Sequence, residues 1–236
     1  IAGGGGADRI VGNGFANHLI GQGGNDVLDG QGGADYMAGG SGDDVYMVEH
    51  TSDIAAEAAF EGNDLVYASI NYTLGAHVEN LTAAGASALS LGGNDLGNVI
   101  IGNVGRNTLN GGGGDDVLAG GGDNDILLGG AGRDVFVFNT VGHKSLNKDM
   151  IQDWNYRDDT IRLDNDIFRK LTKVGVLQSK YFTIGSKAKD ANDYIGVDKK
   201  TGNVWYDPNG DKPGKQVIFA NIGAKKAIFA SDFFVF

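Results

Sequence analysis

The sequence predicts an all-β protein in which short strands and tight turns wind into a stacked coil, closed by a β-rich C-terminal segment. The main observation is a period of nine residues between Gly111 and Val137, which reads GGGGDDVLA, GGGDNDILL and GGAGRDVFV. Glycine opens each unit, aspartate holds the sixth place and a large apolar residue holds the eighth. Glycine permits turns with positive φ, while the apolar half suits a very short strand that gains stability by stacking on the next turn.

A second block of the same repeat opens the chain. Five units follow one another in phase over residues 3–47, and aspartate holds the sixth place in four of them, with Asn17 in the other. Two less regular units over 93–110 carry Asn98 and Asn107 at this place. Asparagine keeps an oxygen ligand but removes a charge, so we expect weaker cation sites at these positions.

Charge and glycine are divided unevenly along the chain. Residues 1–140 carry 3 Lys/Arg, 18 Asp/Glu and 33 of the 41 glycines, a charge balance of −15, whereas residues 141–236 have a balance of +4. Stacked turns would bring aspartates and backbone carbonyls into register, an oxygen cage suited to calcium. We therefore expect the acidic segment to stay disordered until cations bind, with metal as the staple of a chain that has no cysteine. This charge also argues against nucleic acid as a partner.

These units resemble the RTX family, whose repeat Gly-Gly-x-Gly-x-Asp-x-apolar-x forms a calcium-stabilised parallel β-roll. The resemblance implies several calcium ions, each between turns that lie two repeats apart and held by sixth-position carboxylates and glycine-loop carbonyls. The implied side-chain ligands are Asp8, Asp26, Asp35, Asp44, Asp116, Asp125 and Asp134, with Asn17 and Asn107 at weaker sites. The implied loop glycines are Gly21, Gly23, Gly30, Gly39, Gly42, Gly111, Gly113, Gly120, Gly122, Gly129 and Gly132.

The patterns divide the chain into four expected segments. These are a first β-roll block over 1–47, a β-rich spacer over 48–92, a second block over 93–137 and a C-terminal cap with a secretion signal over 138–236. The spacer alternates apolar and polar residues as strands do, and it resembles the spacer commonly found between RTX blocks. We expect it to continue the roll.

Three carboxylates of the spacer offer a possible extra ion site. Asp53, Glu57 and Asp64 lie within a short stretch of it. Exposed carboxylates are more often solvated than bound to an ion, so the alternative of three solvated side chains stays open.

The cap has little glycine, which makes a conventional core possible. We expect a short helix over 165–174 and a β-turn over 207–211, where the spacing does not fit an EF-hand loop. The expected strands lie over 149–154, 159–163, 181–184, 193–197, 203–206, 216–219 and 227–229. The segment resembles the C-terminal cap of RTX proteins, and the resemblance implies a further calcium held by Asp153 and Asp159.

The chain ends in Asp232, Phe233, Phe234, Val235 and Phe236. This ending resembles the uncleaved export signal of type I secretion substrates, which RTX proteins commonly are, and it also fits a final strand packed on the cap. The chain opens with Ile-Ala, without methionine or a signal-peptide pattern, and has no apolar run long enough to span a membrane. We expect part of a longer bacterial protein that is secreted, either extracellular or associated with the cell surface.

The sequence carries no motif of a zinc protease, serine hydrolase, dinucleotide-binding enzyme or P-loop enzyme. We therefore expect a calcium-binding module that is not an enzyme, folds after type I export, and stabilises and caps a larger extracellular protein whose catalytic domain would lie upstream. The alternative is a calcium-dependent adhesin or lectin-like module that binds bacterial surface polysaccharide.

Overall fold

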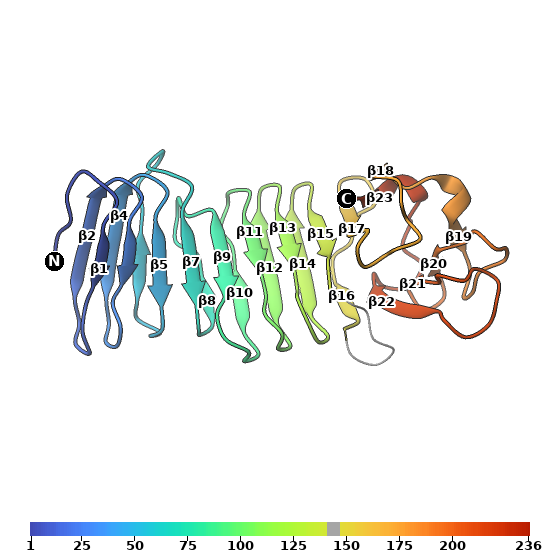
Figure 1. Cartoon of the computed structure of the whole chain (residues 1–236), viewed down its shortest axis with the longest axis horizontal. Helices are drawn as coiled ribbons and strands as arrows, with labels where there is room; N and C mark the ends of the chain where they lie inside the picture. Colours follow the sequence, from blue (N-terminus) through green and yellow to red (C-terminus); the bar gives the residue numbers. More distant parts are fainter. Residues whose placement is uncertain (141–146) are drawn as a thin grey trace.

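The computed structural model describes residues 1–140 and 147–236. They form an elongated β-solenoid that starts at the N-terminus and ends in a rounded cap (Figure 1). The helical elements of these residues are two 3-10 turns, η1 (Ser179–Tyr181) and η2 (Ala230–Asp232). No helix in the described part of the chain is long and apolar enough to cross a membrane.

One face of the solenoid is a sheet of eleven strands within the described residues. Its neighbours pair in parallel, except that β18 is antiparallel to β23 at one end. In spatial order the strands are β1 (Arg9–Val11), β3 (Val27–Asp29), β5 (Val45–Val48), β7 (Leu65–Ala68), β9 (Asn80–Ala83), β11 (Val99–Ile101), β13 (Val117–Ala119), β15 (Val135–Phe138), β17 (Thr160–Leu163), β23 (Phe233–Val235) and β18 (Gly175–Val176).

The other face is divided between two sheets. The first contains β2 (His18–Gly23), β4 (Tyr36–Ser41) and β6 (Ile54–Ala56), all parallel. The second contains, in spatial order, β8 (Tyr72–Thr73), β10 (Ser90–Gly92), β12 (Thr108–Gly113), β14 (Ile126–Ala131), β16 (Asp149–Ile151), β22 (Val217–Asn221), β21 (Asn203–Tyr206), β20 (Ile195–Asp198) and β19 (Phe182–Ile184). The pairings of β20 with β21 and of β21 with β22 are antiparallel.

The core contains a row of apolar side chains, one from each strand of the first face except β18, and it is completed by apolar side chains of the other face. The strand registers place the row members directly opposite one another, and each is at most 5% exposed. The row runs Ile10, Leu28, Tyr46, Val66, Leu81, Ile100, Leu118, Phe136, Ile161 and Phe233. Each such burial contributes about 1.5–3 kcal/mol relative to exposure, and no coil supplies more than a few of them. The hydrophobic core of the roll is therefore thin and continuous.

The spacer keeps this winding. Strands β6 to β10 lie within 48–92. On the first face β7 and β9 pair in parallel with each other and with the coils before and after them, whereas on the other face, among the described residues, β6 pairs only with the coil before it and β8 only with the coil after it. The coil lengths differ from the regular 18 residues, since 20 residues separate Asp44 from Asp64 and 15 separate Asp64 from Glu79. The extra or missing residues are absorbed in the loops, because the buried row itself is unbroken.

The cap differs from the expected elements in two places. The helix expected over 165–174 is wrong, since this segment forms turns that bury Phe168 and Leu171. The strand expected over 227–229 is also wrong, because the Phe229 N–H donates to Asp232 Oδ2 and leads the chain into η2. The remaining expected strands occur, with ends shifted by one or a few residues. Residues 207–211 form turns, as expected.

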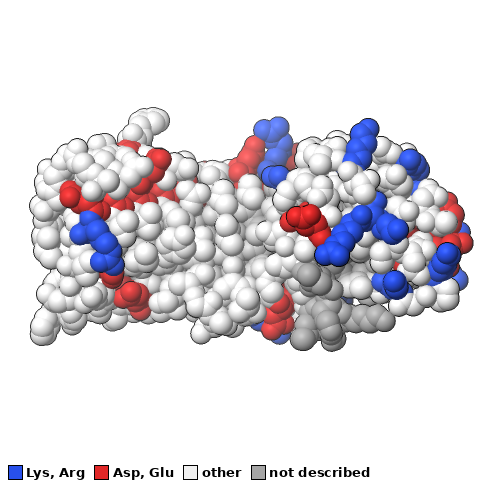
Figure 2. Space-filling model, in the orientation of Figure 1, with Lys and Arg blue, Asp and Glu red and all other residues white. Residues whose placement is uncertain are grey.

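The C-terminal residues form β23, between β17 and β18. Phe233 and Val235 are buried, whereas Phe234 and Phe236 are half-buried beneath the Arg162 guanidinium, whose carbon lies 5.9 and 4.6 Å from the two ring centroids. On the face seen in Figure 2, Lys and Arg gather over the cap and are sparse over the roll. The charge division of the sequence is thus a division between these two parts of the molecule.

Candidate metal sites

The loops of the intact repeats turn through two left-handed residues, at the second and fourth positions. In the unit that starts at Gly21, Gln22 and Gly24 have φ values of 84° and 105°. The first position admits only glycine for a different reason: a Cβ on Gly21 would collide with Asp26 Oδ2 and lie 2.5 Å from the carbonyl oxygen of Gly39. A carboxylate oxygen of one turn and a carbonyl oxygen of the turn two units later therefore converge at this point.

The same steric argument separates the predicted loop glycines into three groups. The first-position glycines each face their own aspartate, and these are Gly21, Gly30, Gly39, Gly111, Gly120 and Gly129. Gly42 and Gly132 are fourth-position residues with positive φ, pressed against the carbonyls of Gly24 and Gly114. The third-position residues, Gly23, Gly113 and Gly122, have no contact closer than 3.0 Å for an added Cβ. At these three positions the backbone carbonyl is the group that could bind a cation.

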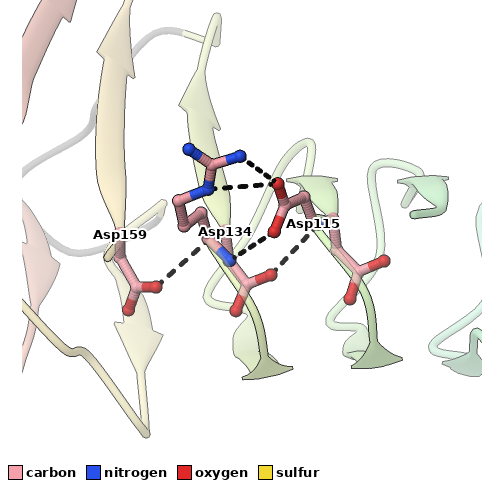
Figure 3. A network of polar contacts seen from close by, with 5 residues as sticks. Asp115, Asp134 and Asp159 are labelled. Atoms are coloured by element: carbon pink, nitrogen blue, oxygen red, sulfur yellow. Dashed lines mark hydrogen bonds and ion pairs between the residues drawn. The ribbon is translucent and has the colours of Figure 1, made fainter. Parts of the chain in front are cut away.

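Acidic side chains form a column along the edge that precedes the strands of the first face. In this first acidic column, Oδ1 of each aspartate accepts the backbone N–H of its counterpart in the previous turn, at 2.8 Å from Asp8 to Asp26 and 2.6 Å from Asp26 to Asp44. The members are Asp8, Asp26, Asp44, Asp64, Glu79, Asn98, Asp116, Asp134 and Asp159. Figure 3 shows its C-terminal end, where Asp134 and Asp159 follow one another.

A second acidic column precedes the strands of the other face and has two parts. Asn17, Asp35 and Asp53 follow one another with N–H to Oδ1 distances of 2.8 and 3.0 Å. Asn107, Asp125 and Asp149 repeat the pattern at 2.7 and 3.1 Å. The column geometry thus brings together residues 18 to 24 positions apart in the sequence.

The second oxygen of these carboxylates is the chemically informative atom. In the described residues, Oδ2 is buried without a hydrogen-bond partner in Asp26, Asp35, Asp44, Asp64, Asp116 and Asp125. Leaving a buried polar atom unpartnered is costly, and a carboxylate oxygen beside a glycine carbonyl is the ligand type that calcium prefers. The residues therefore fit calcium, with each Oδ2 and the first-position carbonyls as donors.

Burial opposes the charge of the column aspartates. It is the largest cause that raises the pKa of Asp44 and Asp125 to about 6, of Asp116 to about 7 and of Asp149 to about 8. Repulsion from neighbouring carboxylates adds to it, as Asp134 and Asp115 do at Asp116. A bound cation would relieve both effects.

All three asparagines accept the backbone N–H four residues earlier through Oδ1, but their amide nitrogens differ, and that of Asn107 is buried without a partner in the described residues. Asn98 Nδ2 donates to the carbonyls of Val78 and Glu79 at 3.1 and 3.2 Å, so at this position the partly positive amide N–H groups face the carbonyl oxygens. The Oδ1 atoms of Asn17 and Asn107 accept the N–H groups of Asn13 and Asn103. Because these oxygens already have donors, weaker calcium sites at Asn17 and Asn107 stay a prediction.

Asp153 and Asp159 approach the last turn of the roll from two directions. Asp159 Oδ1 accepts the Asp134 N–H at 3.3 Å, and Asp153 accepts the N–H groups of Gly129 and Gly130 at 3.1 and 2.8 Å. Burial and then repulsion from Asp153 raise the pKa of Asp134, once the opposing backbone hydrogen bond is allowed for. A calcium shared by Asp153 and Asp159 remains a prediction.

Two column members, Glu79 and Asp149, were missed by sequence reasoning, whereas Asp64 was named only as part of the spacer group. Glu79 and Asp149 each stand two positions before a buried apolar residue, as Asp26 stands before Leu28. That spacing is the signal that would have found them. Irregular loop lengths on either side hid them from a search for a strict period of nine.

The spacer group expected from the sequence is wrong in one member. Asp53 belongs to the second acidic column, and its Oδ2 accepts the N–H groups of Glu49 and His50 at 3.1 and 2.9 Å. Glu57 and Asp64 lie instead beside Asp44. The loop over 49–53 is too short to carry Asp53 across to the other edge.

A comparison with protein families agrees with this geometry. A model described as the RTX calcium-binding nonapeptide repeat matches in four copies, over residues 1–19, 11–46, 92–127 and 101–136. Repeats of this family bind calcium. No curated protein matches the chain.

Among solved structures, the chain is similar to the extracellular lipase LipA from Serratia marcescens. The sequence identity is 15%, the TM-score is 0.35, and the alignment covers 98% of this chain and 39% of the lipase chain. The chain therefore spans about two fifths of the length of that protein.

We expect mutation to separate the two roles of a column carboxylate, which are to accept a backbone N–H through one oxygen and to bind a cation through the other. Asp116→Asn keeps an oxygen for the Asn98 N–H, 2.7 Å away, but removes a ligand charge, so it should raise the calcium concentration at the folding midpoint by about tenfold. Asn107→Asp should lower this midpoint or leave it unchanged. The measurement is circular dichroism during a calcium titration. Asp115→Asn, at an exposed residue paired with Arg133 (Figure 3), is the control that should change little. Equal midpoints for Asp116→Asn and wild type would contradict the assigned register.

The raised pKa values also predict how acid acts on the calcium-free chain. A carboxylate whose pKa is higher in the folded state than when unfolded binds more protons when folded, so stability rises as the pH falls. From pH 7.5 to about 5, which crosses the values of about 6 and 7 at Asp125 and Asp116, the calcium-free roll should gain folded population. Circular dichroism after dialysis against calcium-free buffers measures this. A folded population that falls on acidification would rule it out.

Proposed function

The chain carries RTX calcium-binding nonapeptide repeats, and from this premise we propose that it is a calcium-driven folding module of a larger secreted bacterial protein. The proposal rests on one observation above all, the row of buried Oδ2 atoms that have no hydrogen-bond partner among the described residues. Such a row makes the folded coil depend on cations. The module would stabilise and cap an extracellular protein whose catalytic or other domain lies upstream.

The coupling between turns follows from the two oxygens of each carboxylate. Through Oδ1, Asp44 accepts the N–H of Asp26, and through Oδ2 it would hold an ion between its own turn and the next. An ion that fixes one carboxylate therefore also fixes the backbone of the preceding turn. Binding at one site prepares the next, so folding should be cooperative along the column.

The affinity range of such sites suits folding after export. Extracellular calcium modules bind with dissociation constants of roughly 10⁻⁴–10⁻³ M, far above the free calcium of a cytosol. The acidic half of the chain would stay unfolded inside the cell and pass a type I channel in that state. Outside, calcium would order the two repeat blocks (1–47 and 93–137) and the spacer (48–92) against the cap (138–236).

We further propose that the last five residues serve twice. Before folding, 232–236 would be read as the export signal by the type I apparatus. After folding, Phe233 completes the buried row by packing opposite Ile161, as β23 pairs with β17. The two roles are compatible because the first needs an unfolded chain and the second a folded one.

Calcium titration tests the main proposal. In calcium-free buffer at pH 7.5 residues 1–140 should be disordered, because their balance of −15 is unopposed, and calcium should make them β-rich in a cooperative transition. Circular dichroism follows the transition, with magnesium at equal ionic strength as the control. Magnesium should be much less effective because it demands near-ideal octahedral geometry. A roll that is fully folded without calcium would refute the proposal.

Truncation separates the two proposed roles of the terminus. Deleting 232–236 should abolish secretion and raise the calcium concentration needed for folding of the purified chain. Phe233→Ala alone should cost about 3–5 kcal/mol of folding free energy, and the half-buried Phe234→Ala should cost less. Secretion assays and urea unfolding in saturating calcium are the measurements. Normal secretion of the truncated chain would refute the export role, and unchanged unfolding would refute the packing role.

A further inference from the structure

The first acidic column changes composition where the first repeat block meets the spacer. From Asp44 to Asp64 the coil is 20 residues long, two more than the coil from Asp26 to Asp44. Ala56 is paired with Ala38, so Glu57 takes the place that the first-position Gly39 takes one coil earlier. A carboxylate side chain is thus added at a point where the regular repeat offers only a backbone carbonyl.

Three carboxylates converge at this joint. Ligand oxygens of Asp44, Glu57 and Asp64 all lie within 4.8 Å of one another. Asp44 and Asp64 are 1% and 0% exposed, and Oδ2 of both is buried without a hydrogen-bond partner in the described part of the chain. Glu57 Oε2 is also buried and without a partner there. Each of these three clustered carboxylates therefore keeps one buried oxygen without a partner in the described chain.

Hydrogen bonds fix the side chain of Glu57 beside the first acidic column. Its Oε1 accepts a hydrogen bond from the hydroxyl of Tyr46, and that hydroxyl in turn accepts the Gly39 N–H at 2.7 Å. Tyr46 is fully buried as a member of the apolar row. One oxygen of Glu57 is thus fixed by the core, and the other has no hydrogen-bond partner in the described chain.

No protein cation compensates these charges in the described residues. The ion pairs found there join Arg9 to Asp29 and Arg133 to Asp115, and neither involves the joint. Buried carboxylates at this separation repel one another unless a positive charge lies between them. The arrangement therefore calls for a bound cation.

We propose that Asp44, Glu57 and Asp64 form a three-carboxylate site for a calcium ion at the joint between the first repeat block and the spacer. The site builds on the proposed calcium-dependent folding, but it adds two ligands from outside the repeats, Glu57 and Asp64, since the family match in this block ends at residue 46. A third carboxylate raises the ligand charge above that of a repeat site, so this site should fill at a lower calcium concentration than the repeats. It would lock the longer coil and carry order from the first block into the spacer.

Glu57→Gln tests the site with the smallest change of shape. Isothermal titration and native mass spectrometry of the whole chain should show one calcium fewer at limiting calcium, with the tightest binding phase weakened by at least about tenfold. Glu49→Gln, the same charge change at an exposed glutamate, is the matched control and should keep both the number and the affinity of wild type. Glu57→Asp should also weaken the tightest phase, because the shorter side chain cannot reach the same point.

The sign of the effect decides between an ion and unrelieved repulsion. Without an ion, Glu57→Gln would remove a buried unpaired charge and lower the calcium needed for folding, so an equal or lower midpoint overturns the proposal. If the variant fails to fold, wild type with terbium in place of calcium gives the answer. Terbium emission excited through tyrosine should appear with the first ion bound and should be lost in Tyr46→Phe, whereas its absence at the first ion overturns the site. A wild-type chain that binds no calcium would instead refute the proposed function.

Discussion

The roll depends on carboxylates that are buried in line although burial disfavours their charged form. One oxygen of a column aspartate accepts the backbone N–H of the previous turn, as Asp116 accepts from Asn98 at 2.7 Å, and in six of these aspartates the other oxygen is buried without a partner in the described chain. The hydrogen bond to the first oxygen joins successive turns, whereas the unpartnered second oxygen makes the folded state depend on a bound cation. Each coil buries only a few large apolar side chains, such as Leu118 on one face and Leu127 on the other, so burial of nonpolar surface offsets this cost only in part. Bound cations would supply the remaining stabilisation, and every coil with an unpartnered carboxylate oxygen would depend on them.

The winding tolerates irregular coils because the repeating unit that matters is very short. A carboxylate, any one residue and a buried apolar residue form a fixed triplet, seen at Asp26 with Leu28 and again at Asp64 with Val66. Parallel pairing keeps these triplets aligned, while the loops between them change length. This explains how the spacer continues both the column and the core without nonapeptides.

Much of the roll could be predicted from the sequence, because a strict period fixes both faces at once. The roll itself and its buried positions follow from glycine, aspartate and apolar residues in fixed phase. The joint could not be predicted in this way. Asp53 and Glu57 stand close in the sequence but precede strands of different faces, and only the register of β4 with β6 shows which carboxylate meets Asp44. Local sequence carries no information about that pairing.

The cap was harder to predict for a related reason. Its strands follow tertiary packing rather than a period, and the segment expected as a helix over 165–174 places only two of its apolar residues fully in the core, too few for a helical face. The position of β23 depends on β17, some 70 residues earlier, as its register shows. Polysaccharide binding and the export role rest on sequence resemblance and stay predictions.

The end of the column shows how an open repeat is stopped. A roll leaves unpaired backbone groups and an unfinished row of carboxylates at its last coil, and both invite further stacking. In β23 the backbone edge is covered by the short antiparallel β18, which cannot continue the parallel pattern. By the register of β17 with β23, Ser231 takes the place that Asp159 holds one coil earlier, so β23 has no carboxylate at the column position. The neighbouring Asp232 satisfies both its oxygens locally, since Oδ2 accepts the Phe229 N–H and Oδ1 the Ser231 hydroxyl, at 2.9 and 3.2 Å. The first acidic column therefore ends at Asp159, and the β23 coil needs no further ion of this kind.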